Sequence, residues 1–183
     1  TEYLPWWMDH GWVRALLPWA GAWKPGDGAR VLPLALADGR RVPVAPLVCL
    51  DDVDPGLAID GARLGARALL TMSNDSWFAG DGGGAYLHLV VAAFRSVETG
   101  LPQMRVTNNG ISVVVSAAGE ILESAAVGER RVLVASVPAA VAPTLMVAWG
   151  DWFGRFSTAA MLALFVAGLV FRRNRGDKAP RPG

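Results

Sequence analysis

The stretch RVPVAPLVCLDDVDPG, residues 41–56, joins an apolar run to the single cysteine of the chain and then to three acids. The apolar run, Val42–Leu50, has the composition of a buried strand, and Gly56–Ala66 beyond it has helical periodicity. A buried strand that leads into a helix is the repeating unit of layered α/β folds. Cys49 therefore stands at the end of a strand, where such folds place functional groups.

The same alternation of strands and helices continues over residues 31–137. We predict one further helix, Ala85–Glu98, which ends before Gly100 and Pro102. The further strands that we predict are Val31–Leu36, Ala68–Met72, Met104–Thr107, Ile111–Ser116 and Val132–Val137. Apolar strands separated by helices predict an α/β domain whose sheet is covered by helices, and we place this domain at residues 31–147.

The C-terminal part of the chain predicts a transmembrane helix. Residues 152–171 are an apolar run of 20 residues whose only charge is Arg155. As a helix, such a run crosses about 30 Å of hydrocarbon. The alternative, a buried amphipathic helix, fits poorly because no polar face is visible from Ala159 to Phe171. The tail, 172–183, has five basic residues and one acid, which places it in the cytoplasm and the preceding domain across the membrane.

Residues 1–30 form a tryptophan-rich segment. Five tryptophans lie within 18 residues there, namely Trp6, Trp7, Trp12, Trp19 and Trp23. Each indole needs room and a partner for its N–H when it is buried. The segment is therefore either an ordinary part of the core or a membrane-proximal arm in the lipid interface, and the residues leave both alternatives open.

The composition also points toward membrane contact. Apolar residues make up 52% of the chain and charged residues only 18%. The net charge of +1 gives no reason to expect a nucleic-acid partner. One cysteine excludes an internal disulfide, and the chain has no cysteine–histidine spacing typical of zinc ligands, so we predict no metal and no cofactor.

A lone cysteine is most often a small buried apolar residue, and this is one alternative for Cys49. Its place at a strand end favours the other alternative, a nucleophile. The acids that follow oppose a thiolate, so an activated Cys49 needs a cation or base nearby. Neither Lys24 nor Lys178 is a convincing partner, and neither histidine forms a Cys-His dyad by its spacing.

Polar residues follow or enter two other predicted strands, in SNDSWF (73–78) and RVTNNGIS (105–112). The side chains that they bring to sheet ends are Asn74, Asp75, Arg105, Asn108 and Asn109. These residues either line a site or form tight turns, because Asn-Asp and Asn-Gly favour turns. The glycine-rich run 79–85 lacks the Lys-Ser/Thr ending of a phosphate-binding loop, and we predict a simple loop there.

Taken together, several motifs resemble one family. PLVCLDD, LLTMSNDSWF, HLVVAAFRSVETGLPQMRVTNNGIS and WGDW resemble the C-terminal part of the apolipoprotein N-acyltransferases, integral membrane members of the nitrilase, or carbon–nitrogen hydrolase, superfamily. The similarity runs through nearly the whole chain. It implies a partial nitrilase-like αββα sandwich on the periplasmic side of the bacterial inner membrane, followed by one transmembrane helix and a cytoplasmic tail.

The resemblance also implies an activity. Cys49 matches the nucleophile, which takes an acyl chain from a phospholipid as a thioester and passes it to the N-terminal amine of a diacylglyceryl-cysteine lipoprotein. Glu2 matches a second essential acid, and Asp51, where the family usually has glutamate, matches a residue that supports the nucleophile. The implied substrate-binding residues are Asn74, Trp77, His88 and Asn108. The implied partners are a phospholipid acyl donor, an apolipoprotein acceptor and the membrane.

In the family the catalytic lysine lies several residues before the Glu-Tyr-Leu-Pro motif, and the general-base glutamate lies much further upstream. This chain starts at Thr1, after both, so we expect a fragment without acyltransferase activity of its own. Two alternatives remain open. One is a carbon–nitrogen hydrolase of the amidase or nitrilase type, and the other is an inactive, membrane-anchored homologue.

Overall fold

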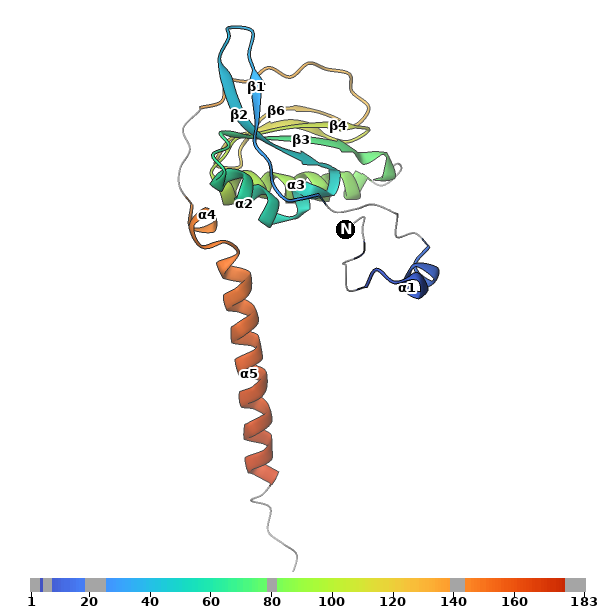
Figure 1. Cartoon of the computed structure of the whole chain (residues 1–183), viewed down its shortest axis with the longest axis vertical. Coiled ribbons are helices and arrows are strands. Elements are labelled where there is room, and N and C mark those ends of the chain that lie inside the picture. The colour runs from blue at the N-terminus through green and yellow to red at the C-terminus, as the bar shows by residue number, and fades with distance from the viewer. Residues whose placement is uncertain (1–3, 5–7, 19–25, 79–81, 139–143, 177–183) are drawn as a thin grey trace, which may run out of the picture.

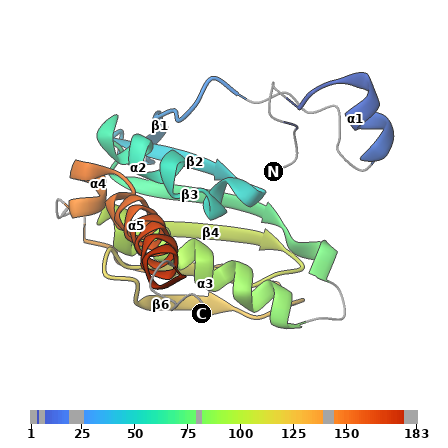
Figure 2. The same cartoon turned by 90° about the horizontal axis from the view of Figure 1, so that it is seen from below.

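The computed structural model describes residues 4, 8–18, 26–78, 82–138 and 144–176. Its strands are β1 (Leu32–Ala35), β2 (Arg41–Val48), β3 (Ala68–Asn74), β4 (Gln103–Asn108), β5 (Ser112–Val115) and β6 (Ile121–Ala125). Its helices are α1 (Gly11–Leu16), α2 (Pro55–Arg63), α3 (Gly82–Thr99), α4 (Leu145–Trp149) and α5 (Trp152–Gly176), with short 3₁₀ helices η1 (Cys49–Val53) and η2 (Asp75–Phe78). Within the described residues the strands form one sheet in chain order, and α2 and α3 cover one of its faces (Figures 1 and 2).

The centre of the sheet is parallel. β2 pairs with β3, and β3 with β4, in parallel, whereas β1, β5 and β6 run antiparallel to their neighbours. Each parallel pair is joined through a crossover helix, and both helices lie on one face because the strand order follows the chain. The register aligns Val48, Met72 and Val106, so the carboxyl ends of the three strands meet at one edge of the sheet.

The core lies between the sheet and the helices α2 and α3. Alternate strand residues point into it, as the burial of Ala45, Leu47 and Leu69 shows. A Cβ atom on Gly61 of α2 would meet the Cβ of Ala45 at 2.7 Å, so this glycine permits the close approach of helix and strand. A second buried cluster joins α3 to β5 through Leu89, Val113 and Val115.

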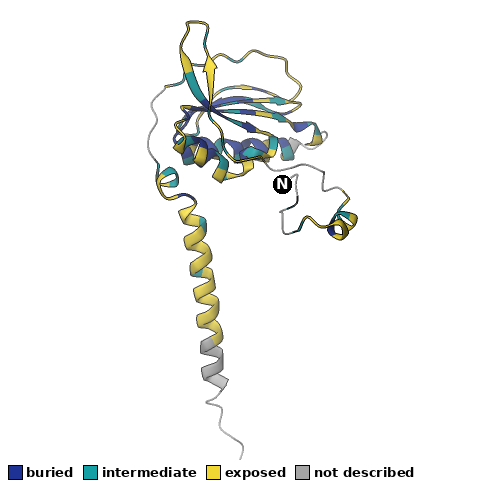
Figure 3. Ribbon diagram, viewed as in Figure 1, coloured by how far each residue is buried: buried dark blue, intermediate teal, exposed yellow. Residues whose placement is uncertain are grey.

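The opposite face of the sheet carries exposed apolar side chains. Val48, Met72 and Val106 have exposed fractions of 57%, 46% and 60%. Figure 3 shows the contrast with the buried layer between sheet and helices. The predicted α/β class is confirmed, and one helix layer on one sheet is half of the expected αββα sandwich. In that architecture the open face is the one against which a second sheet packs.

Two strand predictions differ from the structure. The predicted strand Val132–Val137 is wrong, since residues 131–138 belong to no strand. Exposed and half-buried residues alternate there, as in an extended segment, but no strand among the described residues pairs with it. The prediction also missed β6, an edge strand, because its sequence ILESA lacks clear alternation.

Four of the five tryptophans in the tryptophan-rich segment lie outside the described residues. Trp12, in α1, is described and exposed. The other four are Trp6, Trp7, Trp19 and Trp23, and the structure describes none of them. The division into an arm (1–30), a domain (31–147), a span (152–171) and a tail (172–183) stays a prediction.

The short helix α4 ties the C-terminal helix to the domain. Thr144 Oγ1 accepts a hydrogen bond from the Val147 amide at 3.1 Å, which caps α4, and the same hydroxyl donates to the Glu98 carbonyl of α3. Arg63 Nε of α2 donates to the Val147 carbonyl at 2.8 Å. Gly150, at φ +72°, then makes the turn into α5. These contacts hold α4, which directly precedes α5, against the C-terminal ends of α2 and α3.

α5 extends away from the domain as an exposed helix (Figures 1 and 3). Its window Trp152–Leu169 has a mean hydropathy of 1.4, and none of it is buried. Among the described residues it is the one helix long and apolar enough to cross a membrane, by length and composition. Trp152 packs edge to face against both Trp149 and Phe153 where the helix begins.

Replacing Leu69 with alanine tests the core. Leu69 is 0% exposed between sheet and helices, so truncation should lower the free energy of unfolding by about 2–5 kcal/mol. Chemical denaturation in detergent, followed by circular dichroism, measures the loss. The matched control is Leu64→Ala, because Leu64 is 59% exposed and its truncation should cost no more than about 0.5 kcal/mol. Equal losses in the two variants would contradict the assigned core.

Candidate active site

Cys49 directly follows the end of β2 and begins the tight turn η1. Its side chain is half-buried. Its φ of +52° lies in the left-handed region that non-glycine residues seldom adopt, at a cost of about 1–2 kcal/mol. Strain of this kind persists only where the surroundings hold it, and it concentrates at functional sites. The backbone of Cys49 is therefore the first structural sign of a site at this edge of the sheet.

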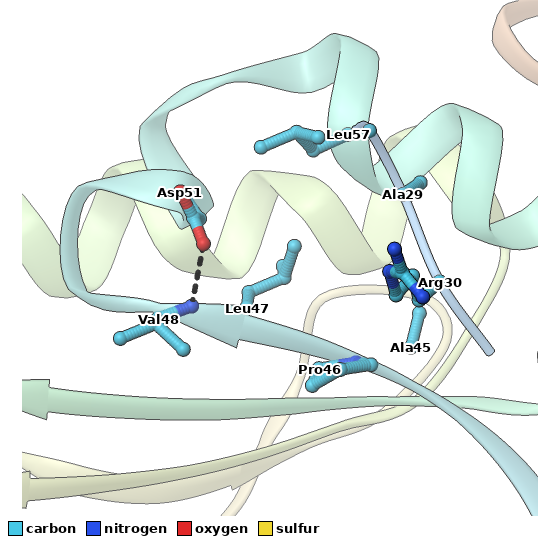
Figure 4. A pocket seen from close by; sticks show the side chains of 9 residues that line it. Ala29, Arg30, Ala45, Pro46, Leu47, Val48, Asp51 and Leu57 are labelled. Atoms are coloured by element: carbon cyan, nitrogen blue, oxygen red, sulfur yellow. Dashed lines mark hydrogen bonds between the residues drawn. The ribbon is translucent and has the colours of Figure 1, made fainter. Parts of the chain in front are cut away.

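Two of the acids after Cys49 fold the chain locally. Asp51 Oδ2 accepts a hydrogen bond from the Val48 amide at 3.0 Å and closes the turn (Figure 4). Asp54 Oδ1 accepts from the Gly56 amide at 2.7 Å and caps α2. The acidic run thus shapes the strand end, the turn and the helix start, all within a few residues.

The remaining acid, Asp52, belongs to a buried ion cluster. The cluster consists of Asp52, Asp75, His88 and Arg105, each at most 6% exposed. His88 Nε2 lies 2.9 Å from Asp52 Oδ1, and His88 Nδ1 lies 3.0 Å from Asp75 Oδ1. Arg105 Nη1 donates to Asp52 Oδ2, and Arg105 Nη2 donates to Asp75 Oδ2 at 3.0 Å. Because the four residues come from η1, η2, α3 and β4, the cluster ties together the carboxyl ends of the parallel strands.

The charges of the buried ion cluster balance only when His88 is protonated. Two carboxylates and one guanidinium leave one negative charge, which an imidazolium cancels while donating to both carboxylates. The hydrogen bond to Asp52 raises the pKa of His88 above its ordinary value of 6.5, and burial opposes this rise. The charges of Asp52 and Asp75 raise the same pKa further, whereas the charge of Arg105 lowers it.

A second buried side chain from α3 reaches the same turn. Arg95 Nη1 donates at 3.2 Å to the carbonyl of Val53, the last residue of η1. Arg95 also pairs with Glu98, with 3.0 Å between Nη2 and Oε1. His88 and Arg95 are seven residues apart, which places both on the same face of the helix. α3 therefore contacts η1 at both Asp52 and Val53.

Amide side chains gather at the ends of β3 and β4. Asn108 Nδ2 donates to Asn74 Oδ1 at 3.3 Å, across the register pair that ends both strands. Asn109, at φ +54°, donates through Nδ2 to Ser76 Oγ at 3.0 Å. Trp77, in η2, is exposed. These contacts are typical of turns, and they also leave polar groups and an indole at the carboxyl edge of the sheet.

A cavity of about 190 Å³ opens beside the cysteine turn (Figure 4). Apolar residues of β2 and Leu57 of α2 form its walls, and its charged members are Asp51 and Arg30. Arg30 also pairs with Asp27 at 2.9 Å. The volume of this cavity is below that of a typical ligand pocket, which is about 300–1,000 Å³. The described residues therefore present Cys49 at an open edge beside a small hollow.

The structure brings some predicted site residues together and separates others. Cys49 and Asp51 share one turn. His88 lies in the interior, within the buried ion cluster. Glu2 and Lys24 lie outside the described residues. Within the part of the chain that is described, no side chain hydrogen-bonds to Cys49, and no group of three or more His, Cys, Asp or Glu residues is arranged to hold a metal ion. The catalytic and substrate-binding assignments stay predictions.

The buried ion cluster was not predicted as a unit. The sequence pattern places Asp75 and Arg105 at sheet ends, but it does not connect them with Asp52 or with each other. One signal was available, namely a charged or titratable residue inside an apolar element. Arg105 interrupts the strand sequence QMRVTN, and His88 interrupts the helical sequence YLHLVV. Such residues are seldom buried without a partner.

The amino-acid sequence matches known proteins over most of its length. A family profile described as carbon-nitrogen hydrolase matches residues 19–144. An apolipoprotein N-acyltransferase of Rhodopseudomonas palustris is 37% identical over 73% of this chain and 24% of that protein. Apolipoprotein N-acyltransferase 2 of Treponema denticola is 28% identical over 99% of this chain and 34% of that protein. The chain thus spans about a quarter to a third of the length of these relatives. The resemblance inferred from the motifs is confirmed.

Among solved structures, the chain is similar to a carbon-nitrogen hydrolase from Helicobacter pylori G27. The TM-score is 0.49 and the identity 22%, over 58% of this chain and 43% of that one. The family profile spans the whole described sheet together with α2 and α3. The predicted nitrilase-like α/β fold is therefore confirmed.

The protonation of His88 predicts a pH-dependent stability. The pKa of His88 in the folded chain is raised above its ordinary value of 6.5. The protonated ring therefore contributes fully to the free energy of unfolding below about pH 6.5. This contribution is lost as the pH rises through the pKa of His88 in the folded chain. Thermal unfolding in detergent, followed from about pH 5.5 to about pH 9, should show a falling midpoint over this window. His88→Gln should remove this part of the pH dependence.

The matched control for this measurement is His10→Gln. The chain has two histidines, and His10 is exposed beside α1. This variant should keep the wild-type profile of midpoint against pH. An unchanged pH profile in His88→Gln would show that another group is responsible.

Proposed function

Because this chain belongs to the carbon–nitrogen hydrolase family, we propose that it carries the nucleophile of an apolipoprotein N-acyltransferase. Relatives that bear this name share 28% and 37% identity with it. The observation that carries the proposal is the backbone of Cys49, strained at the end of β2 and closed by Asp51. A cysteine that only fills space in the core needs no such conformation.

In the proposed reaction Cys49 acts by covalent catalysis. Its Sγ attacks the carbonyl carbon of a phospholipid ester, a thioester forms, and the ester oxygen leaves, with a proton, as the hydroxyl of a lysophospholipid. The N-terminal amine of a diacylglyceryl-cysteine lipoprotein then attacks the thioester. An amide forms, the carbon–sulfur bond breaks, and a proton from the amine restores the thiol. Two easier steps thus replace one difficult transfer.

The other predicted residues have proposed roles at the same edge. Asp51 shapes the turn of the nucleophile, which its hydrogen bond to the Val48 amide supports. Glu2 is assigned by resemblance to orient the catalytic lysine or the attacking amine. The proposed substrate contacts are Asn74, Trp77 and Asn108, which lie at the carboxyl edge of the sheet. The contacts of His88 favour a different role from substrate binding, because they lie within the buried ion cluster.

The proposed thiolate needs a cation and a base besides these residues. The resemblance assigns the two tasks to a lysine and a glutamate that precede the segment matched here. The chain spans 24% and 34% of the length of two relatives. The activity is therefore proposed for a polypeptide of the relatives' length, and residues 1–183 by themselves are proposed to be inactive.

We also propose that α5 crosses the bacterial inner membrane. It is apolar and exposed over Trp152–Leu169, and basic residues follow in the segment 172–175. By the positive-inside rule the basic end lies in the cytoplasm, which leaves the domain on the periplasmic side. Trp149 and Trp152 lie at the domain end of α5, where an interfacial aromatic belt is expected.

The family description itself favours a second candidate, a carbon–nitrogen hydrolase that acts on small amides or nitriles. Such an enzyme uses the same cysteine thioester but passes the acyl group to water. It has no use for an exposed apolar helix of the length of α5, so α5 favours the acyltransferase. The third possibility, an inactive membrane-anchored homologue, is an outcome of the experiment that follows.

Acylation of Cys49 tests the proposal directly. A polypeptide of the relatives' length, in membranes with an alkyne-labelled phospholipid, should gain a hydroxylamine-sensitive label on Cys49. Cys49→Ser should abolish the label and slow lipoprotein acylation about 1,000-fold or more, because the nucleophile is lost. The surface variant Leu64→Ala should behave like the wild type.

Each other outcome of this experiment supports a different function. Retained lipoprotein acylation in Cys49→Ser would exclude Cys49 as the nucleophile. Release of ammonia from amides without any phospholipid label would indicate the hydrolase. If the wild type shows neither labelling nor ammonia release, the protein is an inactive homologue.

Carbonate extraction tests the membrane assignment of α5. Expressed in bacteria, the 183-residue chain should stay in the membrane pellet at alkaline pH, because about 20 apolar residues in a helix insert stably. Removal of residues 152–176 should release the domain into the supernatant. Removal of residues 177–183, which leaves α5 intact, is the matched control and should not. If the intact chain appeared in the supernatant, α5 would not be a membrane-spanning helix.

A further inference from the structure

Two side chains of α3 and Arg105 of β4 hold the cysteine turn η1 to the interior of the domain. From α3, His88 Nε2 contacts Asp52 Oδ1 at 2.9 Å, and Arg95 Nη1 donates to the Val53 carbonyl at 3.2 Å. Asp52 is fully buried, whereas the hydrogen bond that closes the turn locally lies at the surface. Surface hydrogen bonds compete with water, so the buried contacts supply most of the restraint on η1.

This restraint matters because the backbone of Cys49 is strained. A non-glycine residue at φ +52° relaxes to a more favourable conformation once its neighbours can move. Cys49 and Asp52 lie three residues apart in the same five-residue turn. A displacement of the Asp52 carboxylate is therefore transmitted to the backbone that presents the thiol.

His88 also joins η1 to the neighbouring turn, η2. Its Nδ1 lies 3.0 Å from Asp75 Oδ1, and Asp75 directly follows Asn74, the last residue of β3. The same ring thus connects the turn of the cysteine with the amide edge of the sheet. Arg105 contacts the other oxygens of both aspartates, but it projects from within β4 and is held by the strand pairing. Of these two cations, His88 is the one that can lose its proton, and with it its positive charge, near neutral pH.

The charged groups that face His88 are Asp52 from η1, Asp75 from η2 and Arg105 from β4, and the Phe78 ring packs edge-on at 5.9 Å. Arg105 Nη2 lies 3.1 Å from His88 Nδ1, because both nitrogens are drawn to the same carboxylate. In the protonated ring both nitrogens donate, one to each aspartate. In the neutral ring one aspartate loses the hydrogen bond from His88 and keeps the one from Arg105, and the cluster keeps an uncompensated negative charge.

We infer that His88 is a positioning residue for the nucleophile, and that its protonated ring, through Asp52, holds η1 in the conformation that presents Cys49. Loss of the proton, or of the ring, releases the turn and leaves the sheet in place. The inference rests on the proposed function, in which Cys49 attacks the substrate. It assigns His88 to act through Asp52 and not by touching the substrate.

Amide hydrogen exchange tests this inference without any chemistry at Cys49. The amides of Val48 and Asp54 hydrogen-bond within the turn and report on η1. The amide of Leu69 donates across the sheet at 2.8 Å and reports on the sheet. The 183-residue chain in detergent micelles is compared as wild type, His88→Gln and the matched control His10→Gln.

In His88→Gln, protection of the η1 amides should fall at least about tenfold, because a lost hydrogen bond between charged groups shifts local opening by that much or more. Protection of the Leu69 amide should change far less, and His10→Gln should match the wild type. Unchanged protection in η1 would overturn the inference. An equal loss in η1 and at Leu69 would also overturn it, because that result describes general destabilisation.

A pH series on the wild type gives the same test without a variant. After correction for intrinsic exchange, protection of the η1 amides should fall as the pH rises above about 6.5, while that of Leu69 is retained. This measurement tests the positioning role of His88 even if His88→Gln does not fold. Protection in η1 that follows Leu69 at every pH would overturn the inference.

Single-turnover acylation separates this inference from the proposed function. In a polypeptide of the relatives' length, His88→Gln should slow the acylation of Cys49 by phospholipid at least about tenfold, with little change in the half-saturating phospholipid concentration. A wild-type rate in this variant would overturn the positioning role. If the wild type is not acylated at all, the proposed function fails, and the exchange results alone decide whether His88 positions the turn.

Discussion

Two aspartates buried at the ends of neighbouring parallel strands require two buried cations, and this requirement organises the whole edge of the sheet. Asp52 follows β2 and Asp75 follows β3, where an unpaired carboxylate would be costly. Arg105 from β4 and His88 from α3 supply the partners. Such a cluster adds little net stability compared with apolar packing, but removal of one member is expensive. Its effect is to select one arrangement of the turns that it joins.

The strained cysteine and the helix proposed to enter the membrane both depend on α3. Through His88, this helix holds the turn that begins with Cys49. Through the carbonyl of Glu98, it also supports the Thr144 cap of α4, from which α5 continues. A nucleophile at the end of a rigid strand is placed with less positional error than one on a free loop.

Local patterns predicted most of the fold, and their failures have a physical reason. β2, β3 and β4 were predicted from short apolar runs, and α2 and α3 from helical periodicity, all of which are local properties. Residues 132–137 alternate as a strand does, but alternation describes only an extended backbone, and a strand also needs a partner. β6 shows the converse, because it pairs with β5 through an irregular register near Val114 despite an uninformative sequence.

The amino-acid sequence by itself determined the α/β alternation, the apolar C-terminal helix and the family resemblance, because each depends on residue types at short spacing. The tertiary structure alone decided which polar residues meet. Asp52 and Arg105 are 53 residues apart in the sequence. The parallel strand register that brings them together cannot be read from the sequence around either residue. It also decided the left-handed backbone of Cys49, since a strand end takes that conformation only when distant groups hold the next turn. Desolvation makes the pairing of buried charges obligatory, but only the packed fold determines which partners are within reach.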